Sequence, residues 1–192
     1  MNFYKSIFNY LSGILIISII VSANVVSLHA LESHLIPNIN PSSISLKEYP
    51  INIALFYFNN DCFDTPEKYN EISEKIMQNA LKNFKNTDKI KIVEISKLES
   101  LCLKKFNCPL KNIKNDYQYF TLGKEVSANY IITGNYYVIN NEISVNIQII
   151  DVNTEEMIIL LRYKADITKE SKLLINTMIK DISDIFYSKN KL

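Results

Sequence analysis

The sequence predicts an α/β (α+β) fold in which helices pack on a single mixed sheet of about five strands. In the first half of the chain, short apolar runs alternate with helical apolar stripes, which is typical of parallel strands joined by helices. In the second half, two strand-like runs flank Asn140-Asn141 and indicate an antiparallel hairpin. A final amphipathic segment can cover the sheet, so we expect the order β-α-β-α-α-β-β-β-α.

The folded domain is expected over residues 51–188, after two segments that do not belong to it. Residues 1–30 contain one charge, Lys5, then an apolar run and small residues. This is the order of a secretory signal peptide, with cleavage near residue 23 or residue 30. An uncleaved membrane anchor is the alternative. Residues 31–50 are rich in proline and serine and have no periodicity, which indicates a linker.

The first half of the domain is expected to contain two strands and three helices. Residues 51–58 and residues 90–95 are short apolar runs that predict buried strands. Between them, Asp64 or Thr65 can cap a helix. The apolar stripe of that helix comprises Ile72, Ile76, Ala80 and Phe84. The two short helices that follow are expected over 96–103, with Ser96 as the cap, and over 116–126, with Asp116 as the cap.

The hairpin around Asn140-Asn141 has a predictable register. Asn tolerates positive φ, so a two-residue turn is natural there and aligns the flanking strands. The expected pairs are Ile139–Glu142, Val138–Ile143, Tyr137–Ser144, Tyr136–Val145, Asn135–Asn146, Gly134–Ile147, Thr133–Gln148 and Ile132–Ile149. In this register one face is polar and the other is apolar, whereas a slip of one residue would mix the two sets.

A second turn at Asn153-Thr154-Glu155 returns the chain as a strand over Met157–Lys164. Pairing across this turn places Arg162 beside Asn146 and Lys164 beside Ser144. On the other face, Leu161 and Ile159 lie beside Ile147 and Ile149. Thr168 is expected to start the last helix. Its apolar stripe, which is expected to cover the apolar face, comprises Ile175, Met178, Ile182 and Ile185.

The polar side of these three strands is the candidate partner-binding surface. Hydrogen-bonding groups around one tyrosine and two cations suit a protein partner. The residues are Thr133, Asn135, Tyr137, Ser144, Asn146, Gln148, Arg162 and Lys164. The alternatives are a solvated sheet face, or a face covered by a middle helix. An edge strand that adds to a partner's sheet is another route to binding.

Composition excludes several classes of function. The chain has 192 residues and a formal net charge of +1, so there is no basic excess to attract nucleic acid. The three glycines lie in no phosphate-binding or nucleophile-elbow motif, and both histidines, His29 and His34, precede the expected domain. We therefore expect a non-enzymatic protein with no catalytic residues, no cofactor and no metal. A carboxylate-only enzyme is the remaining catalytic option.

Two groups of carboxylates lie at strand ends and turns: Asp61, Asp64 and Glu67, and Asp151, Glu155 and Glu156. The first group has the donors of a hard-metal site, and the second could pair as acid and base. Their positions favour helix-cap and turn roles instead.

The cysteines fit an oxidising compartment. Cys102 and Cys108 are close in sequence and flank a polar loop, which predicts a local disulfide. Cys62 is then the odd thiol. Zinc is the alternative, but three thiols without a nearby histidine are too few for a closed site.

Two segments resemble a known family pattern. One is Ala128-Asn129-Tyr130-Ile131-Ile132-Thr133-Gly134, and the other runs from Val145 to Thr154. Together they resemble the periplasmic α/β domain shared by the curli secretion subunit CsgG, the amino-terminal domain of TolB, the flagellar protein FlgO and the lipoprotein activators of penicillin-binding proteins. The resemblance covers about residues 50–187, and Cys102, Cys108 and Leu122-Gly123 match it loosely.

The sequence departs from this family pattern at several points. Asn129 replaces the usual Asp, Glu155 stands where Gly is usual, and no lipobox cysteine follows the apolar run. A side chain at the glycine position implies strain or a different turn. The resemblance implies an exported accessory protein of the bacterial periplasm or envelope that binds a protein partner in assembly or transport. A subunit of a homo-oligomeric envelope assembly is the alternative.

Overall fold

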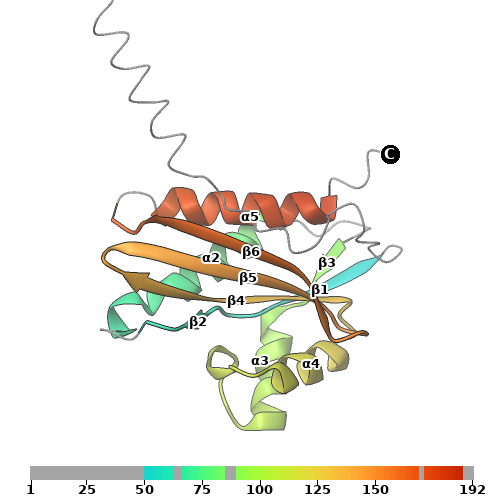
Figure 1. The fold of residues 1–192 in the computed structure, drawn as a ribbon. Helices are drawn as coiled ribbons and strands as arrows, with labels where there is room; N and C mark the ends of the chain where they lie inside the picture. Colours follow the sequence, from blue (N-terminus) through green and yellow to red (C-terminus); the bar gives the residue numbers. More distant parts are fainter. Residues whose placement is uncertain (1–49, 63–65, 85–89, 169–170, 188–192) are drawn as a thin grey trace, which may run out of the picture. The chain divides into compact units, whose positions relative to one another are not determined.

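The computed structural model describes residues 50–62, 66–84, 90–168 and 171–187. The predicted signal peptide with its cleavage positions, the linker up to residue 49, both histidines, and the helix caps Asp64 and Thr65 lie outside the described residues. Within them, the predicted fold class is confirmed: one mixed, open sheet carries the helices (Figure 1).

The described part contains six strands, four α-helices and two short 3-10 helices. In chain order these are β1 (Ile51–Leu55), β2 (Asn59–Asn60), η2 (Pro66–Tyr69), α2 (Glu71–Asn83), β3 (Ile90–Ile92), α3 (Ile95–Phe106), η3 (Leu110–Asn112), α4 (Asp116–Glu125), β4 (Tyr130–Ile139), β5 (Glu142–Asp151), β6 (Glu156–Asp166) and α5 (Ser171–Tyr187). The strand order is β3-β1-β4-β5-β6, and β2 pairs with β4 beyond the end of β1.

The sheet is parallel at one side and antiparallel at the other. β1 pairs in parallel with β3 and β4, whereas β4, β5 and β6 form an antiparallel meander. The register predicted for both turns is confirmed, from Ile139–Glu142 at the first turn to the Arg162–Asn146 and Lys164–Ser144 pairs across the second. Asn140 and Asn141 have φ values of 51° and 65°, as a two-residue hairpin turn requires.

A reciprocal hydrogen-bond pair joins β1 to the start of β4. The Asn52 amide donates to Asn129 Oδ1, and the Asn129 amide donates to the Asn52 carbonyl, each at 2.7 Å. The Asn52 side chain also donates to the carbonyl of Ser127 at 3.1 Å. The amide oxygen of Asn129 therefore accepts the main-chain hydrogen bond that an aspartate could accept at this position.

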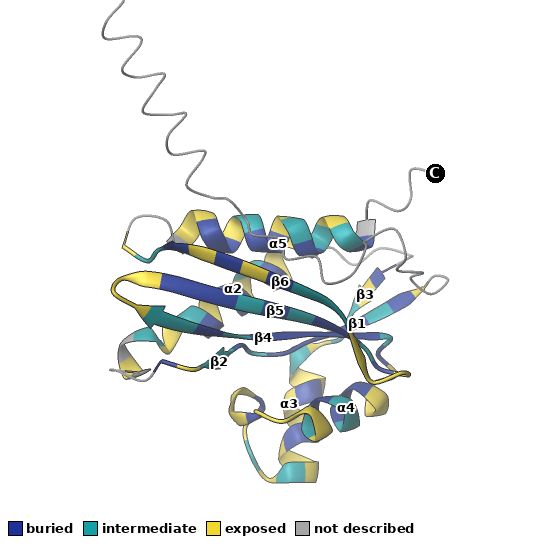
Figure 2. Ribbon diagram, viewed as in Figure 1, coloured by how far each residue is buried: buried dark blue, intermediate teal, exposed yellow. Residues whose placement is uncertain are grey.

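One face of the sheet, here called the apolar face, is covered by α2 and α5 (Figure 2). The buried strand residues on it include Ile132, Tyr136, Val145, Ile147, Ile149, Leu161 and Tyr163. Ile76 and Ala80 of α2 and Ile175, Met178 and Ile182 of α5 pack on them, which confirms the predicted helical stripes and the cover by the last helix.

The opposite face is covered only in part. Leu98 and Cys102 of α3 and Leu122 of α4 form a smaller core with Ala54, Phe56, Ile131 and Val152 of the sheet region. In Figure 1, α3 and α4 lie below the sheet near β1 and the start of β4, while the hairpin ends of β4, β5 and β6 extend beyond them. The part of this face that carries the eight predicted partner-binding residues of β4, β5 and β6 is called the polar face.

Several predicted boundaries are wrong. The first strand was expected over 51–58, but β1 ends at Leu55 and the next strand is β2. Between them, the Phe56 amide still donates to the Ile132 carbonyl of β4 at 2.9 Å. The cap of α4 is Asn115, whose side chain accepts from the Gln118 amide at 2.9 Å, and not Asp116. The residue before α3 is Glu94, without a side-chain cap, and not Ser96. The start of the last helix at Thr168 stays a prediction, because residues 169–170 lie outside the described ranges and the helix is described from Ser171.

Candidate functional site

The polar face is built from three rows of paired residues. Thr133 lies opposite Gln148 at the inner end, Asn135, Asn146 and Arg162 form the middle row, and Tyr137, Ser144 and Lys164 form the outer row. All eight predicted residues therefore share one face, because side chains alternate along each strand and the rows are in register.

The eight residues differ in depth. Arg162 and Lys164 are exposed, whereas Asn135, Tyr137, Asn146 and Gln148 are half-buried. Thr133 and Ser144 are buried, with only 3% and 5% of their surface exposed. The two exposed cations and the four half-buried residues can contact a partner, and the buried Thr133 and Ser144 lie beneath them.

A chain of hydrogen bonds holds the middle of the polar face. Asn146 Nδ2 donates to Asn135 Oδ1 at 3.0 Å, and Asn135 Nδ2 donates to the carboxylate of Asp61. Each amide is thereby fixed in orientation before any partner arrives. A surface with fixed hydrogen-bonding groups loses less conformational entropy on binding than a mobile one.

The two cations of the polar face differ in their partners. Lys164 Nζ donates to Glu142 Oε1 at 3.0 Å, and this hydrogen bond raises the pKa of the ammonium. The Arg162 side chain makes no hydrogen bond or ion pair with any residue in the described ranges. Its guanidinium carries five donors in a planar fork, and they stay available for a carboxylate or backbone carbonyls.

Tyr119 of α4 closes the inner end of the polar face. Its hydroxyl donates to the Ile113 carbonyl at 3.1 Å and accepts from Asn59 Nδ2 at 3.1 Å. Burial raises the pKa of this phenol, and the neighbouring Thr133 hydroxyl partly offsets that rise. Thr133 Oγ1 itself has no hydrogen bond of good geometry among the described residues. Thr133 is thus covered by α4, and the accessible part of the polar face begins beyond it.

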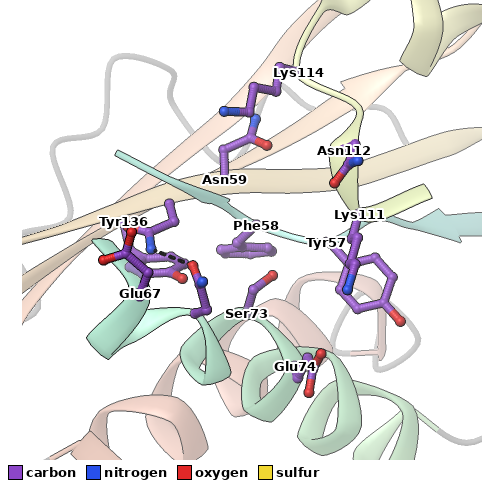
Figure 3. A pocket seen from close by; sticks show the side chains of 12 residues that line it. Tyr57, Phe58, Asn59, Glu67, Ser73, Glu74, Lys111, Asn112, Lys114 and Tyr136 are labelled. Carbon is purple, nitrogen blue, oxygen red and sulfur yellow. Dashed lines mark hydrogen bonds between the residues drawn. The ribbon is translucent and has the colours of Figure 1, made fainter. Parts of the chain in front are cut away.

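A pocket of about 410 Å³ lies at the edge of the sheet beside β2, where the sequence predicts nothing. Figure 3 shows Glu67, Ser73 and Glu74 on one side of Phe58, with Asn112 and Lys114 on the other. The first group belongs to η2 and α2, and the second to η3 and the residue after Ile113. Aromatic residues and amides of the intervening segment form the base.

Three of the carboxylates weighed as catalytic or metal sites, Asp61, Asp151 and Glu155, make contacts that hold turns or neighbouring side chains in place. Asp151 Oδ1 accepts from the Asn153 amide at 2.7 Å and so shapes the second turn. Glu155 has a φ of 59°, the left-handed conformation expected at a position where the family has glycine, and it pairs with Lys124. Among the described residues, no group of three His, Cys, Asp or Glu side chains could hold a metal ion.

Cys102 and Cys108 lie together as thiols. Their Sγ atoms are 3.7 Å apart, and burial raises the pKa of Cys102 to about 12. The disulfide between them stays a prediction. Cys62 is a buried thiol packed in the core of the apolar face.

Comparisons with known proteins find similar structures but no similar sequences. No protein-family model matches the chain, and no curated protein does. The LpoB C-terminal domain from Escherichia coli superposes with a TM-score of 0.50 at 16% identity, covering 65% of this chain and 87% of that one. The same domain from Salmonella enterica gives 0.46 at 14% identity, covering 64% and 87%. TolB from Acinetobacter baumannii gives 0.41 at 16% identity, covering 75% and 30%.

The first of these matches shows that the chain shares the fold of the LpoB C-terminal domain. No helix in the described ranges is long and apolar enough to cross a membrane.

Proposed function

We propose that this protein is an exported, non-enzymatic accessory protein of the bacterial periplasm or envelope, which binds a protein partner through the polar face. The observation that carries the proposal is the outer part of β4–β6, where the sheet is left uncovered and its exposed side is polar. A sheet face that only needed to be soluble would not require fixed amides beside an unpaired arginine.

The composition of the polar face suits recognition. A tyrosine and an arginine, the residue types that most often dominate binding energy, lie in adjacent rows around the Asn135–Asn146 hydrogen bond. Tyr137 is half-buried, so its ring is held by its neighbours while one side stays accessible. Arg162 can then anchor a carboxylate of the partner beside that ring.

Export and envelope location rest on sequence and fold together. The amino-terminal signal-like segment supports export, and the shared fold with the LpoB C-terminal domain agrees with the resemblance of residues 128–134 and 145–154 to periplasmic domains. The finer assignment, to the group that includes CsgG and FlgO, is part of this proposal, and a subunit of a homo-oligomeric envelope assembly is its alternative.

The test is crosslinking of the tagged protein in its own cells, followed by identification of the proteins recovered from the envelope fraction. We expect one envelope protein to be recovered with the wild-type chain and lost with the double variant Tyr137→Ala/Arg162→Ala. The matched control is Tyr117→Ala/Lys104→Ala, which removes an exposed tyrosine and a cation from α3 and α4.

Equal recovery of the envelope protein with both double variants would exclude the polar face as its binding surface. Recovery of the protein itself alone would contradict a separate partner and favour a homo-oligomer.

A further inference from the structure

A pocket lies at the sheet edge beside β2, lined by residues other than the eight of the polar face. We infer that the pocket beside β2 binds an extended peptide segment of a partner, in which basic and acidic residues alternate. This inference is independent of the polar face and concerns a different partner chemistry.

The first observation is that the sheet edge at the pocket is open. β3 pairs with β1 only as far as Ile53, where the Val93 amide donates to the Ile53 carbonyl at 2.9 Å. Beyond that point, no described strand flanks the chain from Phe56 to Phe58 on the side away from β4. An extended peptide can add to such an edge through main-chain hydrogen bonds.

The second observation is the charge of the two pocket walls. Glu67 and Glu74 lie on the wall formed by η2 and α2, and Lys111 and Lys114 lie on the wall that follows α3 (Figure 3). All four are exposed, and none forms a salt bridge with another residue of the described ranges. The walls therefore present opposite charges across the open edge, with no partner of their own.

The arrangement of the walls selects the pattern of the ligand. α2 packs on the apolar face of the sheet, whereas Leu110 and Ile113 beside the two lysines pack on the opposite face. In an added strand, successive side chains point to opposite faces. A basic residue would then face Glu67 and Glu74, and the next residue, if acidic, would face Lys111 and Lys114.

The experiment is an NMR titration of the purified, isotope-labelled protein with two capped tetrapeptides. One is acetyl-Lys-Glu-Lys-Glu-amide, and the other is acetyl-Lys-Lys-Glu-Glu-amide, which has the same composition and net charge without the alternation. We expect the alternating peptide to shift the amides of Phe58, Ser73 and Lys111 and to bind about fivefold more tightly, as two surface ion pairs would give. Equal affinity, or no shift at these amides, would overturn the inference.

Variants separate the walls from the rest of the surface. Lys111→Ala/Lys114→Ala should weaken the alternating peptide about fivefold, whereas Lys97→Ala/Lys104→Ala on α3 should leave its affinity unchanged. Loss of affinity in both lysine variants alike would mean a nonspecific charge effect and would contradict the site.

The outcome is distinguishable from that of the polar face. The crosslinked partner should be lost with Tyr137→Ala/Arg162→Ala, which leaves the pocket unchanged. Peptide binding in the pocket should persist in that variant, so either proposal can fail while the other stands.

Discussion

The two faces of the sheet are formed by the same strands, yet only one of them is covered along its whole length. On the apolar face, Ile147 and Met178 are fully buried between the strands and α5. On the opposite face, α3 and α4 cover the region near β1, and the strands beyond it carry amides, a tyrosine and cations. Alternation along a strand thus places the apolar core of the meander on one side and its polar residues on the other.

The largest loss of stability is expected at Gly134, where the apolar face has no space for an added side chain. A Cβ atom at Gly134 would lie 2.1 Å from the Asn146 carbonyl oxygen and 2.9 Å from the Phe58 ring. Because the nearest atom is backbone, Gly134→Ala should destabilise the fold by about 3 kcal/mol in urea unfolding. At Gly123 on the other side, the closest atom is the Ile131 side-chain end at 2.8 Å, which can move. Gly123→Ala should be close to neutral, and equal losses would contradict the comparison.

Neighbouring residues on β5 test the two faces directly. Ile147 points into the apolar core, and Gln148 is half-exposed on the polar face. Ile147→Ala should cost about 3 kcal/mol, because it removes buried surface and leaves a cavity. Gln148→Ala should change the free energy of unfolding by less than about 0.5 kcal/mol. A large loss for Gln148→Ala would show that the polar face also stabilises the fold.

Oxidation of Cys102 and Cys108 to a disulfide would stabilise the smaller core, which lies on the face of the sheet covered by α3 and α4. Cys102 and Cys108 are six positions apart with their Sγ atoms 3.7 Å apart, so a disulfide needs only a small shift. Closing this short loop should stabilise the protein by about 2 kcal/mol. The measurement is the melting temperature with and without reductant, with the crosslink checked by mass spectrometry. Failure of mild oxidation to join the two cysteines would disprove the predicted disulfide.

The smallest effect concerns one hydrogen bond on the apolar face. The Tyr163 hydroxyl donates to Asp181 Oδ2 at 2.9 Å and ties β6 to α5. Tyr163→Phe should cost about 1 kcal/mol at neutral pH.

The same tyrosine predicts a loss of stability in alkali. Burial, followed by the charge of Asp181, raises the pKa of Tyr163 above the ordinary value of 10.0 for a tyrosine. Above about pH 10 the unfolded phenol loses its proton while the folded one keeps it, so the unfolded state is favoured and stability falls as pH rises. Tyr163→Phe should flatten this fall in urea titrations between pH 9 and about pH 11. An unchanged slope would assign the loss to other groups.

The meander could be predicted from sequence because its information is local. Asn140-Asn141 can take positive φ, and this turn sets the pairing of β4 with β5, which in turn orders the polar and apolar sides. The polar face follows directly from that register. The burial of its residues does not follow from the register, because Thr133 is buried by Tyr119, a residue of α4.

The edge pocket could not be predicted in the same way. β2 is two residues long, too short for any periodicity, and its neighbours Ser73 and Lys111 come from separate segments. The missed caps have a similar cause. Asn115 and Asp116 are both good capping residues, and only the backbone conformation, extended at Asn115, decides between them.

The reciprocal hydrogen bonds between Asn52 and Asn129 join two segments that are synthesised at different times. These residues are 77 positions apart in the chain. A ribosome adds about 5–20 residues per second, so β4 is synthesised about 4 to 15 s after β1. During that interval β1 lacks the neighbour that holds it in the middle of the sheet, whereas each strand of the meander follows its partner at once. The amino-terminal strand therefore waits for its central neighbour, and a chaperone could bind it during that interval.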